Sequence, residues 1–307
     1  VGLDATIGLA LQLEQFRAIE YEEWSSQIAT VAMFLTDHQL NLALEELTGL
    51  PPNRFPLKHS AVVRAGNALR LDWREVCPID NDTFIMGNPP FYGARQLSDE
   101  QREDMGVVFG NAKGVNELDY VTAWFFKAAK YMEGTTARAA FVATNSITQG
   151  EQPPYLWPNL TPLGMGIDFA HRTFEWANDA SGQASVHCVI VGFSANAKGT
   201  TRPLWSYETV KSEPVMVAVR NINAYLLDAP DVLVPPRSRP LDPRVQKLVY
   251  GSMPNDNGHL AKISPETAEE IRATDPIAAK YLRRIVGAKE TINNLERYCL
   301  WLKSANP

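Results

Sequence analysis

The stretch from Gly87 to Phe91, Gly-Asn-Pro-Pro-Phe, brings together residue types that suit one kind of chemistry. Two consecutive prolines lack backbone N–H donors and fix φ at about −65°, so the apolar run before them must end as a strand at Met86 or Gly87. The Asn88 side chain and the rigid Pro89 carbonyl can together accept both hydrogens of an amino group on a planar base. Phe91 adds a stacking face, worth ~1–3 kcal/mol per base. The alternative interpretation is a proline-terminated strand followed by a core phenylalanine.

Strands that alternate with helices are predicted to position this stretch. Between residues 21 and 47, Trp24, Ile28, Val31 and Leu35 recur at spacings of four, three and four, which predicts a helix. A second helix is predicted over residues 118–132. Strands are predicted from short apolar runs at residues 16–20, 67–73, 83–87, 139–144, 166–174 and 186–194. This alternation indicates an α/β fold with a largely parallel sheet, in which ligands bind beyond the carboxyl ends of the strands.

The character of the sequence changes near residue 212. We therefore predict a main domain over residues 1–212, and a connector with the beginning of a second domain over residues 213–307. The proline-rich residues 223–243 are predicted to connect domains and not to pack. Neither internal repeats nor low-complexity tracts are found in the sequence.

Composition narrows the class of protein. The chain of 307 residues is 45% hydrophobic and 21% charged, which is ordinary for a globular protein, and no apolar run approaches the ~18 residues of a membrane span. Cys77, Cys188 and Cys299 are predicted to be reduced core thiols of a cytoplasmic protein. His171 and His187 belong to no set with metal-ligand spacing, so we expect no metal site. The net charge of −6 argues against a protein that coats nucleic acid in general, but it is compatible with a local basic cleft.

The Asn-Pro-Pro-Phe stretch resembles motif IV of amino-methyltransferases, which use S-adenosylmethionine. A wider resemblance, to the type IIL, MmeI-like restriction–modification enzymes, rests on five stretches. These are RAIEYEEW…IATVAMFLTDHQLN, GNPPFYGARQLSDEQREDM, LDYVTAWFFKAA, AHRTFEWANDASGQASVHCVIVGF and YLRRIVGAKETINNLERYCLWL. The resemblance implies a class I, Rossmann-like methyltransferase fold followed by the start of a target-recognition domain. It also implies bacterial, cytoplasmic methylation of adenine N6 in double-stranded DNA, with the target base flipped out of the duplex.

The resemblance also implies roles for individual residues. Asn88, Pro89, Pro90 and Phe91 are the expected catalytic stretch. Glu20 is expected to bind the cofactor ribose, and Asp72 its adenine amino group. The alternatives are a solvated Glu20 and an Asp72 that caps a helix.

Further roles implied by the resemblance lie later in the chain. Asp119 is expected to bind the cofactor, with Tyr120 and Phe126 beside it, and Asn145 and Ser146 to line the cleft. Phe174 or Trp176 is expected to stack on the flipped base opposite Phe91, and the sequence leaves both open; ordinary packing is the alternative for each ring.

One expected feature is missing from the sequence. The family pattern has a glycine-rich motif I loop before motif II, and residues 1–20 offer only the isolated Gly2 and Gly8. We therefore expect a fragment whose fold is incomplete at its N-terminus, which binds S-adenosylmethionine weakly or not at all and self-associates through open strand edges. Two other functions are kept as alternatives: N-methylation of glutamine or another amine, because release-factor methyltransferases carry a similar Asn-Pro-Pro-Tyr, and DNA recognition without catalysis.

Overall fold

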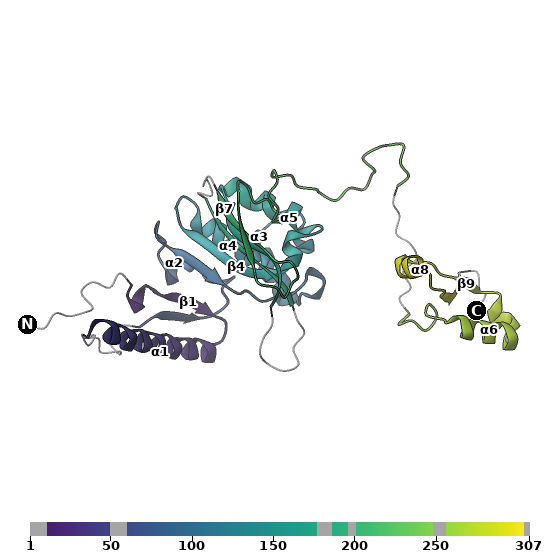
Figure 1. Ribbon diagram of the computed structural model, residues 1–307, viewed down its shortest axis with the longest axis horizontal. Helices are drawn as coiled ribbons and strands as arrows, with labels where there is room; N and C mark the ends of the chain where they lie inside the picture. The colour runs from purple at the N-terminus through teal and green to yellow at the C-terminus, as the bar shows by residue number, and fades with distance from the viewer. Residues whose placement is uncertain (1–10, 50–59, 177–185, 196–200, 248–255, 304–307) are drawn as a thin grey trace, which may run out of the picture. The chain divides into compact units, whose positions relative to one another are not determined.

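The computed structural model describes residues 11–49, 60–176, 186–195, 201–247 and 256–303. The chain divides into two compact units, Val1–Pro236 and Arg237–Pro307, shown in Figure 1. The α-helices of the first unit are α1 (Glu23–Thr48), α2 (Trp73–Val76), α3 (Asp99–Phe109), α4 (Thr122–Met132) and α5 (Gln152–Leu160). Its strands are β1 (Arg17–Glu20), β2 (Val62–Ala65), β3 (Phe84–Gly87), β4 (Arg138–Thr144), β5 (Gly166–Trp176), β6 (Val186–Ser194), β7 (Arg202–Ser206) and β8 (Val215–Val219). Short 3-10 helices are η2 (Leu13–Gln15), η3 (Ala94–Gln96), η4 (Val115–Glu117), η5 (Asn145–Thr148) and η6 (Thr161–Leu163).

The large sheet of the first unit has the order β3-β4-β6-β5-β7-β8. β3 pairs with β4 in parallel, β6 runs antiparallel to both β4 and β5, and β7 is parallel to β5 and antiparallel to β8. β3, β4, β5 and β7 therefore share one direction. The predicted largely parallel sheet is correct for these four strands, but β6 and β8 make the observed sheet mixed.

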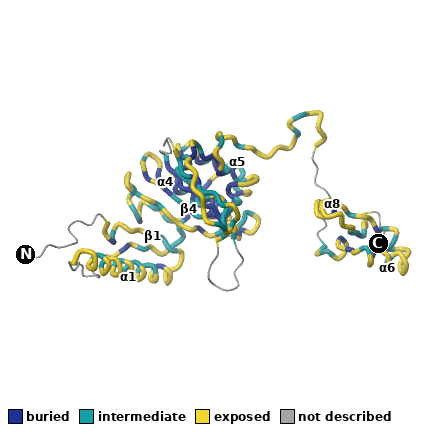
Figure 2. Tube along the Cα trace, in the orientation of Figure 1, coloured by how far each residue is buried: buried dark blue, intermediate teal, exposed yellow. Residues whose placement is uncertain are grey.

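The main hydrophobic core lies between this sheet and its helices. Phe125 of α4, Phe141 of β4 and Phe193 of β6 are each at most 2% exposed, and their ring centroids lie 5.3–6.0 Å apart. Figure 2 shows buried residues gathered around α4, β4 and α5. This core fixes the strand ends that carry the candidate site.

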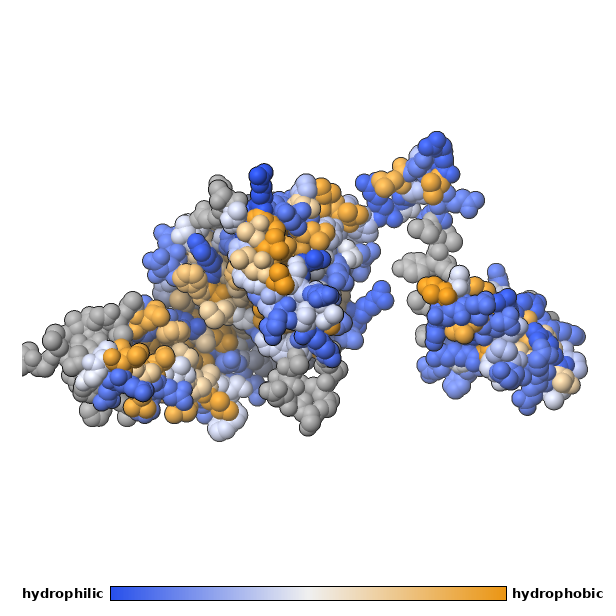
Figure 3. All heavy atoms as spheres, in the orientation of Figure 1, coloured by the Kyte–Doolittle hydropathy of each residue, from blue (hydrophilic) through white to orange (hydrophobic). Residues whose placement is uncertain are grey.

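A second, two-stranded sheet pairs β1 with β2 in parallel, and α1 runs alongside it in Figure 1. α1 confirms the helix predicted from residue spacing. It ends at Thr48 and is followed by Gly49, whose φ of 67° suits a residue without a Cβ. Its apolar stripe is not buried, however: Trp24 is 70% exposed and Leu35 is 58% exposed. In Figure 3 hydrophobic side chains accordingly appear on the surface of this region.

The prediction of a strand at residues 67–73 is wrong. The strand is β2, and the chain then turns at Gly66, which has a φ of 148°. The Asn67 side chain accepts the N–H of Leu69 at 2.9 Å, and α2 begins directly after Asp72. A local turn therefore replaces the alternating pattern that the apolar residues suggested.

The segment after residue 212 also differs from its prediction. β8 adds to the large sheet, and Ile222 and Leu226 are each 2% exposed within the main core. The first part of the proline-rich segment therefore packs, and the compact units divide after Pro236.

The second unit has a small core of its own. It contains α6 (Pro265–Thr274), α7 (Pro276–Ala279), β9 (Leu282–Arg284), α8 (Ala288–Asn293) and β10 (Tyr298–Leu300). β9 and β10 pair in antiparallel fashion, and Ile263, Ala268 and Leu282 form the buried cluster. Across the described residues of both units, no helix combines the length and the apolar character needed to cross a membrane.

Candidate active site

The Asn-Pro-Pro-Phe stretch follows β3 directly, as its sequence predicts. β3 ends at Gly87, and Asn88 is exposed, Pro89 is buried and Phe91 is half-buried. A Cβ at Gly87 would lie 3.5 Å from the ring of Phe141, so the strand end packs closely on β4. The stretch therefore leaves an edge strand that is paired with β4, and it presents the Asn88 amide to solvent.

The residues after Phe91 are held by the turn that opens α4. The Tyr120 N–H donates to the Tyr92 carbonyl at 2.9 Å, and the Ala94 N–H donates to Asp119 Oδ1 at 3.0 Å. The rings of Tyr92 and Tyr120 also meet edge to face at 6.3 Å. The stretch is thus tied down on both sides, by β3 before it and by Asp119 and Tyr120 after it.

Asp119 is buried, and protein groups surround its carboxylate. Ser146 donates to Oδ2 at 2.5 Å, and Gln152 Nε2 donates to Oδ1 at 3.1 Å. The Gln152 side chain also accepts the Asp119 N–H at 3.1 Å. With Ala94, these contacts tie the segment after β3 to the ends of β4 and α5. This geometry supports a role for Asp119 in holding the loop, and a direct cofactor contact stays a prediction.

The predicted stacking residues lie at the matching edge of the sheet. Phe174 pairs with Cys188 of β6, and Cys188 pairs with Thr144 of β4. Gly87 pairs with Phe141, three residues before Thr144 in the same strand. Because β3, β4 and β5 share one direction, Phe174 lies at the same carboxyl edge as Asn-Pro-Pro-Phe and level with it.

Phe174 belongs to an aromatic group on β5, on β7 and directly after β7. Its ring stacks on Tyr207 with centroids 5.4 Å apart, and His171 Nδ1 lies 2.8 Å from the Tyr207 hydroxyl. His171 in turn stacks on Trp205 at 4.5 Å, and burial lowers its pKa. His171 is therefore packed among aromatic rings. Trp176 lies at the end of β5 and is 40% exposed.

The two predicted acidic residues near β1 and β2 lie close to each other in the fold. Glu20 ends β1, and its carbonyl accepts the N–H of Gly66, directly after β2. Asp72 caps α2, because its Oδ1 accepts the Arg74 N–H at 2.9 Å, and α2 contacts β1. The helix-cap alternative for Asp72 is therefore observed. Glu20 lies at the carboxyl end of β1, and Asp72 follows β2 after a turn. Carboxylate acceptors suit a ribose and an adenine amino group, and a cofactor contact of this pair stays a prediction.

The remaining predictions divide between the site and the core. Ser146 joins the Asp119 cluster, and Asn145 opens the same 3-10 helix. Phe126, by contrast, is 7% exposed and stacks on Phe109 at 4.8 Å, so it is a core residue. Cys188 and Cys299 are buried, as predicted for core thiols, whereas Cys77 is only half-buried. Burial raises the pKa of Cys188 to about 11. Among the described residues, no group of His, Cys, Asp or Glu is placed to hold a metal ion.

Sequence reasoning missed three polar residues that organise this region. Gln152 holds Asp119, and Asp104 and Lys127 connect α3 and α4 to the segment before Asp72. One signal in the sequence pointed to Asp104: it stands directly before Met105 and four residues before Val108, two apolar residues that α3 buries. A carboxylate on a buried helix face requires donors, which here come from distant segments.

Comparison with known proteins places these features in a family. The description "MmeI, DNA-methyltransferase domain" matches residues 3–206, and "MmeI, target recognition domain" matches residues 228–307. DNA methyltransferase A of Bacillus subtilis (strain 168) is 38% identical over 299 residues, which are 96% of this chain and 33% of that protein. The solved structure of the type IIL restriction–modification enzyme MmeI in complex with DNA is 42% identical, with a TM-score of 0.89, and is matched over 97% of this chain and 40% of its own.

The chain thus spans about a third of the length of the curated relative and two fifths of the solved one. The first domain match includes the Asn-Pro-Pro-Phe stretch, the Asp119 cluster and the aromatic end of β5. Because that match covers most of the sequence, the chain belongs to the family of MmeI-like DNA methyltransferases.

Proposed function

We propose that the protein carrying this chain transfers a methyl group from S-adenosylmethionine to N6 of adenine in double-stranded DNA, within a restriction–modification enzyme. One observation carries the proposal: an exposed Asn88 follows β3 at the same sheet edge as Phe174. Family membership supports it, and the neighbouring contacts supply the rigidity that the chemistry needs.

Methyl transfer to an amino nitrogen is a direct in-line displacement, so catalysis rests on position. The Asn88 side-chain carbonyl and the Pro89 carbonyl would accept the two amino hydrogens. These hydrogen bonds favour a tetrahedral nitrogen whose lone pair is directed at the methyl group. Pro89 is buried and the residues after Phe91 are tied to Asp119 and Tyr120, so the backbone that carries the acceptors is held before the substrate arrives.

An adenine amino group cannot be reached inside a duplex, so the base must be flipped out. Phe91 and an aromatic residue at the end of β5 would stack on its two faces. Stacking on a π-face is worth ~1–3 kcal/mol per base, which offsets part of the unstacking cost. We assign the second face to Phe174, because β-sheet register places it level with Asn-Pro-Pro-Phe, whereas Trp176 lies two residues further along β5.

Glu20 and Asp72 are the proposed holders of the cofactor. S-adenosylmethionine supplies an electrophilic methyl group, and these two carboxylates would bind the ribose hydroxyls and the adenine amino group. Asp72 already accepts the Arg74 N–H with Oδ1, and its exposed carboxylate has a second oxygen to offer a ligand.

The second unit is the proposed contact to DNA. Residues 237–307 carry twelve Lys and Arg against eight Asp and Glu, a formal charge of +4 within a chain of net charge −6. A positive balance suits phosphate contacts. Such a substrate places the reaction where bacterial DNA is found, in the cytoplasm.

Two other functions receive less support. A glutamine methyltransferase would explain Asn-Pro-Pro-Phe but not the match of residues 228–307 to a target recognition domain. A protein that only recognises DNA would not explain the exposed Asn88 or the contacts that fix the loop after it.

The Asn88→Ala variant tests the proposal in the protein that carries this chain. Asn88 is exposed, so the fold is expected to stay intact while the single-turnover rate of adenine methylation drops by at least about 100-fold, the usual size for loss of one transition-state acceptor or donor. Gln96→Ala is the matched control, since Gln96 is an exposed amide side chain in the same loop. Methylation by Asn88→Ala at the wild-type rate would contradict the proposal.

A further inference from the structure

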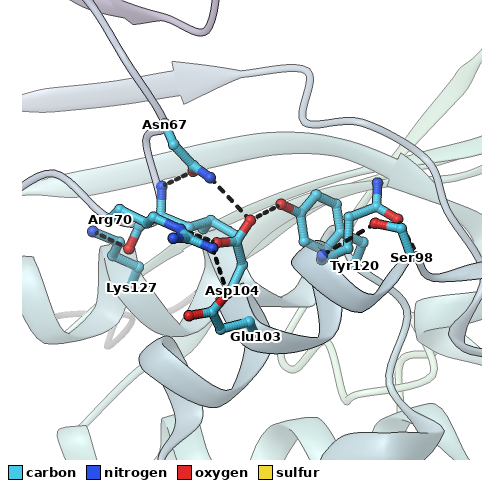
Figure 4. A network of polar contacts seen from close by, with 9 residues as sticks. Asn67, Arg70, Ser98, Glu103, Asp104, Tyr120 and Lys127 are labelled. Atoms are coloured by element: carbon cyan, nitrogen blue, oxygen red, sulfur yellow. Dashed lines mark hydrogen bonds and ion pairs between the residues drawn. The ribbon is translucent and has the colours of Figure 1, made fainter.

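The buried carboxylate of Asp104, in α3, joins three segments that are distant in sequence (Figure 4). It is 2% exposed. The Tyr120 hydroxyl donates to its Oδ2 at 2.6 Å, and Asn67 Nδ2 donates to the same oxygen at 2.9 Å. Arg70 Nε donates to its Oδ1 at 2.5 Å. Every one of these donors points toward Asp104 in Figure 4.

The network is built for a charged carboxylate. Burial acts to raise the pKa of Asp104, but the hydrogen bonds from Tyr120, Arg70 and Asn67 outweigh it and hold the pKa below its ordinary value. Burial and the same carboxylate raise the pKa of Tyr120, so its hydroxyl stays a donor. Hydrogen bonds to a charged group are about twice as strong as neutral ones, so this junction is a firm one.

On one side, the network fixes the segment that leads to Asp72. Asn67 Oδ1 accepts the Leu69 N–H at 2.9 Å. From α4, Lys127 Nζ donates to the Leu69 carbonyl at 2.7 Å and to the Leu71 carbonyl at 2.6 Å. Residues 67–71 are therefore held by α3 and α4 together, immediately before the proposed cofactor-binding carboxylate.

On the other side, the network fixes the segment that follows Phe91. Tyr120 contacts Asp104 through its hydroxyl and donates its backbone N–H to the Tyr92 carbonyl at 2.9 Å. Its neighbour Asp119 accepts the N–H of Ala94. A single tyrosine thus connects Asp104 to the loop that presents the proposed target-base acceptors.

We propose that Asp104 is a positioning residue that couples the cofactor-binding segment, residues 67–72, to the target-base segment, residues 88–94. The inference rests on the proposed function, because the names of the two segments come from it. The junction sets the two segments in one rigid arrangement, so that an adjustment of either is transmitted through α3 to the other. A direct contact of Asp104 with cofactor or base is not part of the inference.

Hydrogen exchange on this 307-residue chain tests the coupling without any activity. We expect Asp104→Asn to speed exchange in both segments, on the order of tenfold, the size of one hydrogen bond to a charged group. Tyr120→Phe keeps the ring and removes only the hydroxyl. It is therefore expected to speed exchange of the Leu69 and Leu71 amides, which Tyr120 does not touch.

Glu103→Gln is the matched control. Glu103 precedes Asp104 on α3 and pairs with the same Arg70 at 3.1 Å, but its side chain is 66% exposed. A surface pair of this kind contributes little, so exchange in both segments is expected to stay at the wild-type rate. If Asp104→Asn does not fold, as judged by circular dichroism, Tyr120→Phe carries the test.

Kinetics on the protein that carries this chain separate positioning from stability. Asp104→Asn is expected to raise the dissociation constant for S-adenosylmethionine and to lower the single-turnover methylation rate at saturating cofactor. Lys127→Met acts only on the cofactor side, so it is expected to raise the dissociation constant by a larger factor than it lowers the rate.

The coupling is overturned if folded Tyr120→Phe speeds exchange only at residues 92–94, or if Asp104→Asn behaves like Glu103→Gln. These outcomes leave the proposed function standing, since it is decided by wild-type methylation and Asn88→Ala. A wild-type protein that does not methylate adenine would instead end the proposed function, and the exchange experiment would still decide the coupling.

Discussion

Phe174 and Trp176 differ in how their rings are held, and this bears on which of them we propose to stack on a flipped base. Phe174 stacks on Tyr207 at 5.4 Å and meets His171 edge to face at 6.4 Å, so its ring is oriented before a base arrives. Trp176 is 40% exposed at the end of its strand. A supported ring loses less conformational freedom when a base stacks on it.

We therefore predict that Phe174→Ala impairs base flipping more than Trp176→Ala does. The measurement is the fluorescence of 2-aminopurine at the target position in duplex DNA, which reports loss of stacking. Phe174→Ala is expected to weaken the flipped state by ~1–3 kcal/mol. An equal or larger effect of Trp176→Ala would reverse the assignment.

At the scale of single residues, the sequence predicts the structural environment of a residue where its neighbours in the chain determine that environment. Asn88 could be placed after a strand because two prolines end that strand. The cap formed by Asp72 could be stated only as an alternative. The burial of Phe126 against Phe109 could not be predicted, because it depends on how α3 and α4 pack. The same holds for the Asp119 cluster, whose donors come from three separate segments.

At the scale of elements, α3 contributes stability that depends on pH through Asp104. The pKa of this carboxyl is lowered in the folded state, whereas its unfolded value is about 3.9. Its contribution is therefore present above about pH 4 and is lost as the pH falls through the folded-state pKa. We predict that the stability difference between wild type and Asp104→Asn is largest near neutral pH and shrinks below about pH 4.

Urea unfolding followed across the acid range measures this difference. Asn resembles a protonated Asp, so the two proteins converge once Asp104 is protonated. Glu103→Gln is expected to differ little from wild type at any pH, because Glu103 is exposed. A difference between wild type and Asp104→Asn that stays constant down to about pH 2 would show that the charge of Asp104 is not what stabilises α3.

Helices and strands with a clear hydrophobic periodicity could be predicted from the sequence, whereas turns could be predicted less well. α1 (Glu23–Thr48) matches the helix expected over residues 21–47. Residues 67–73 mimic a strand because Leu69 and Leu71 alternate with polar residues, yet Gly66 and Asn67 impose a turn. Strand order and the reversed β6 follow from pairing between distant segments, which local patterns do not encode.

At the scale of the whole molecule, the exposed apolar surface predicts self-association of this chain. On α1, Trp24, Ile28 and Val31 are each more than half exposed, and Met86 on β3 is 81% exposed. Monomeric proteins rarely expose contiguous apolar patches of this kind. Sedimentation velocity is expected to show a weight-average mass that rises with concentration.

The double variant Ile28→Glu, Val31→Glu is expected to lower this mass toward that of the monomer, because it places two charges on the apolar stripe of α1. Thr36→Glu adds a charge to an exposed position of the same helix outside the stripe and serves as the control. A monomer at all concentrations would refute the prediction, and an unchanged mass in the double variant would locate the contact elsewhere.

The existence of a separate small core in residues 237–307 has a consequence for cooperativity. Its buried cluster is Ile263, Ala268 and Leu282, whereas the first unit has three phenylalanines packed together and many more buried side chains. The two cores differ greatly in size, so we predict two calorimetric transitions, with the smaller core melting first. Leu282→Ala is expected to shift only the lower transition and Phe193→Ala only the upper one, and a single transition moved by both variants would contradict this. Residues 237–307 would then unfold transiently at temperatures at which β3, whose end carries Asn88, is still fully folded.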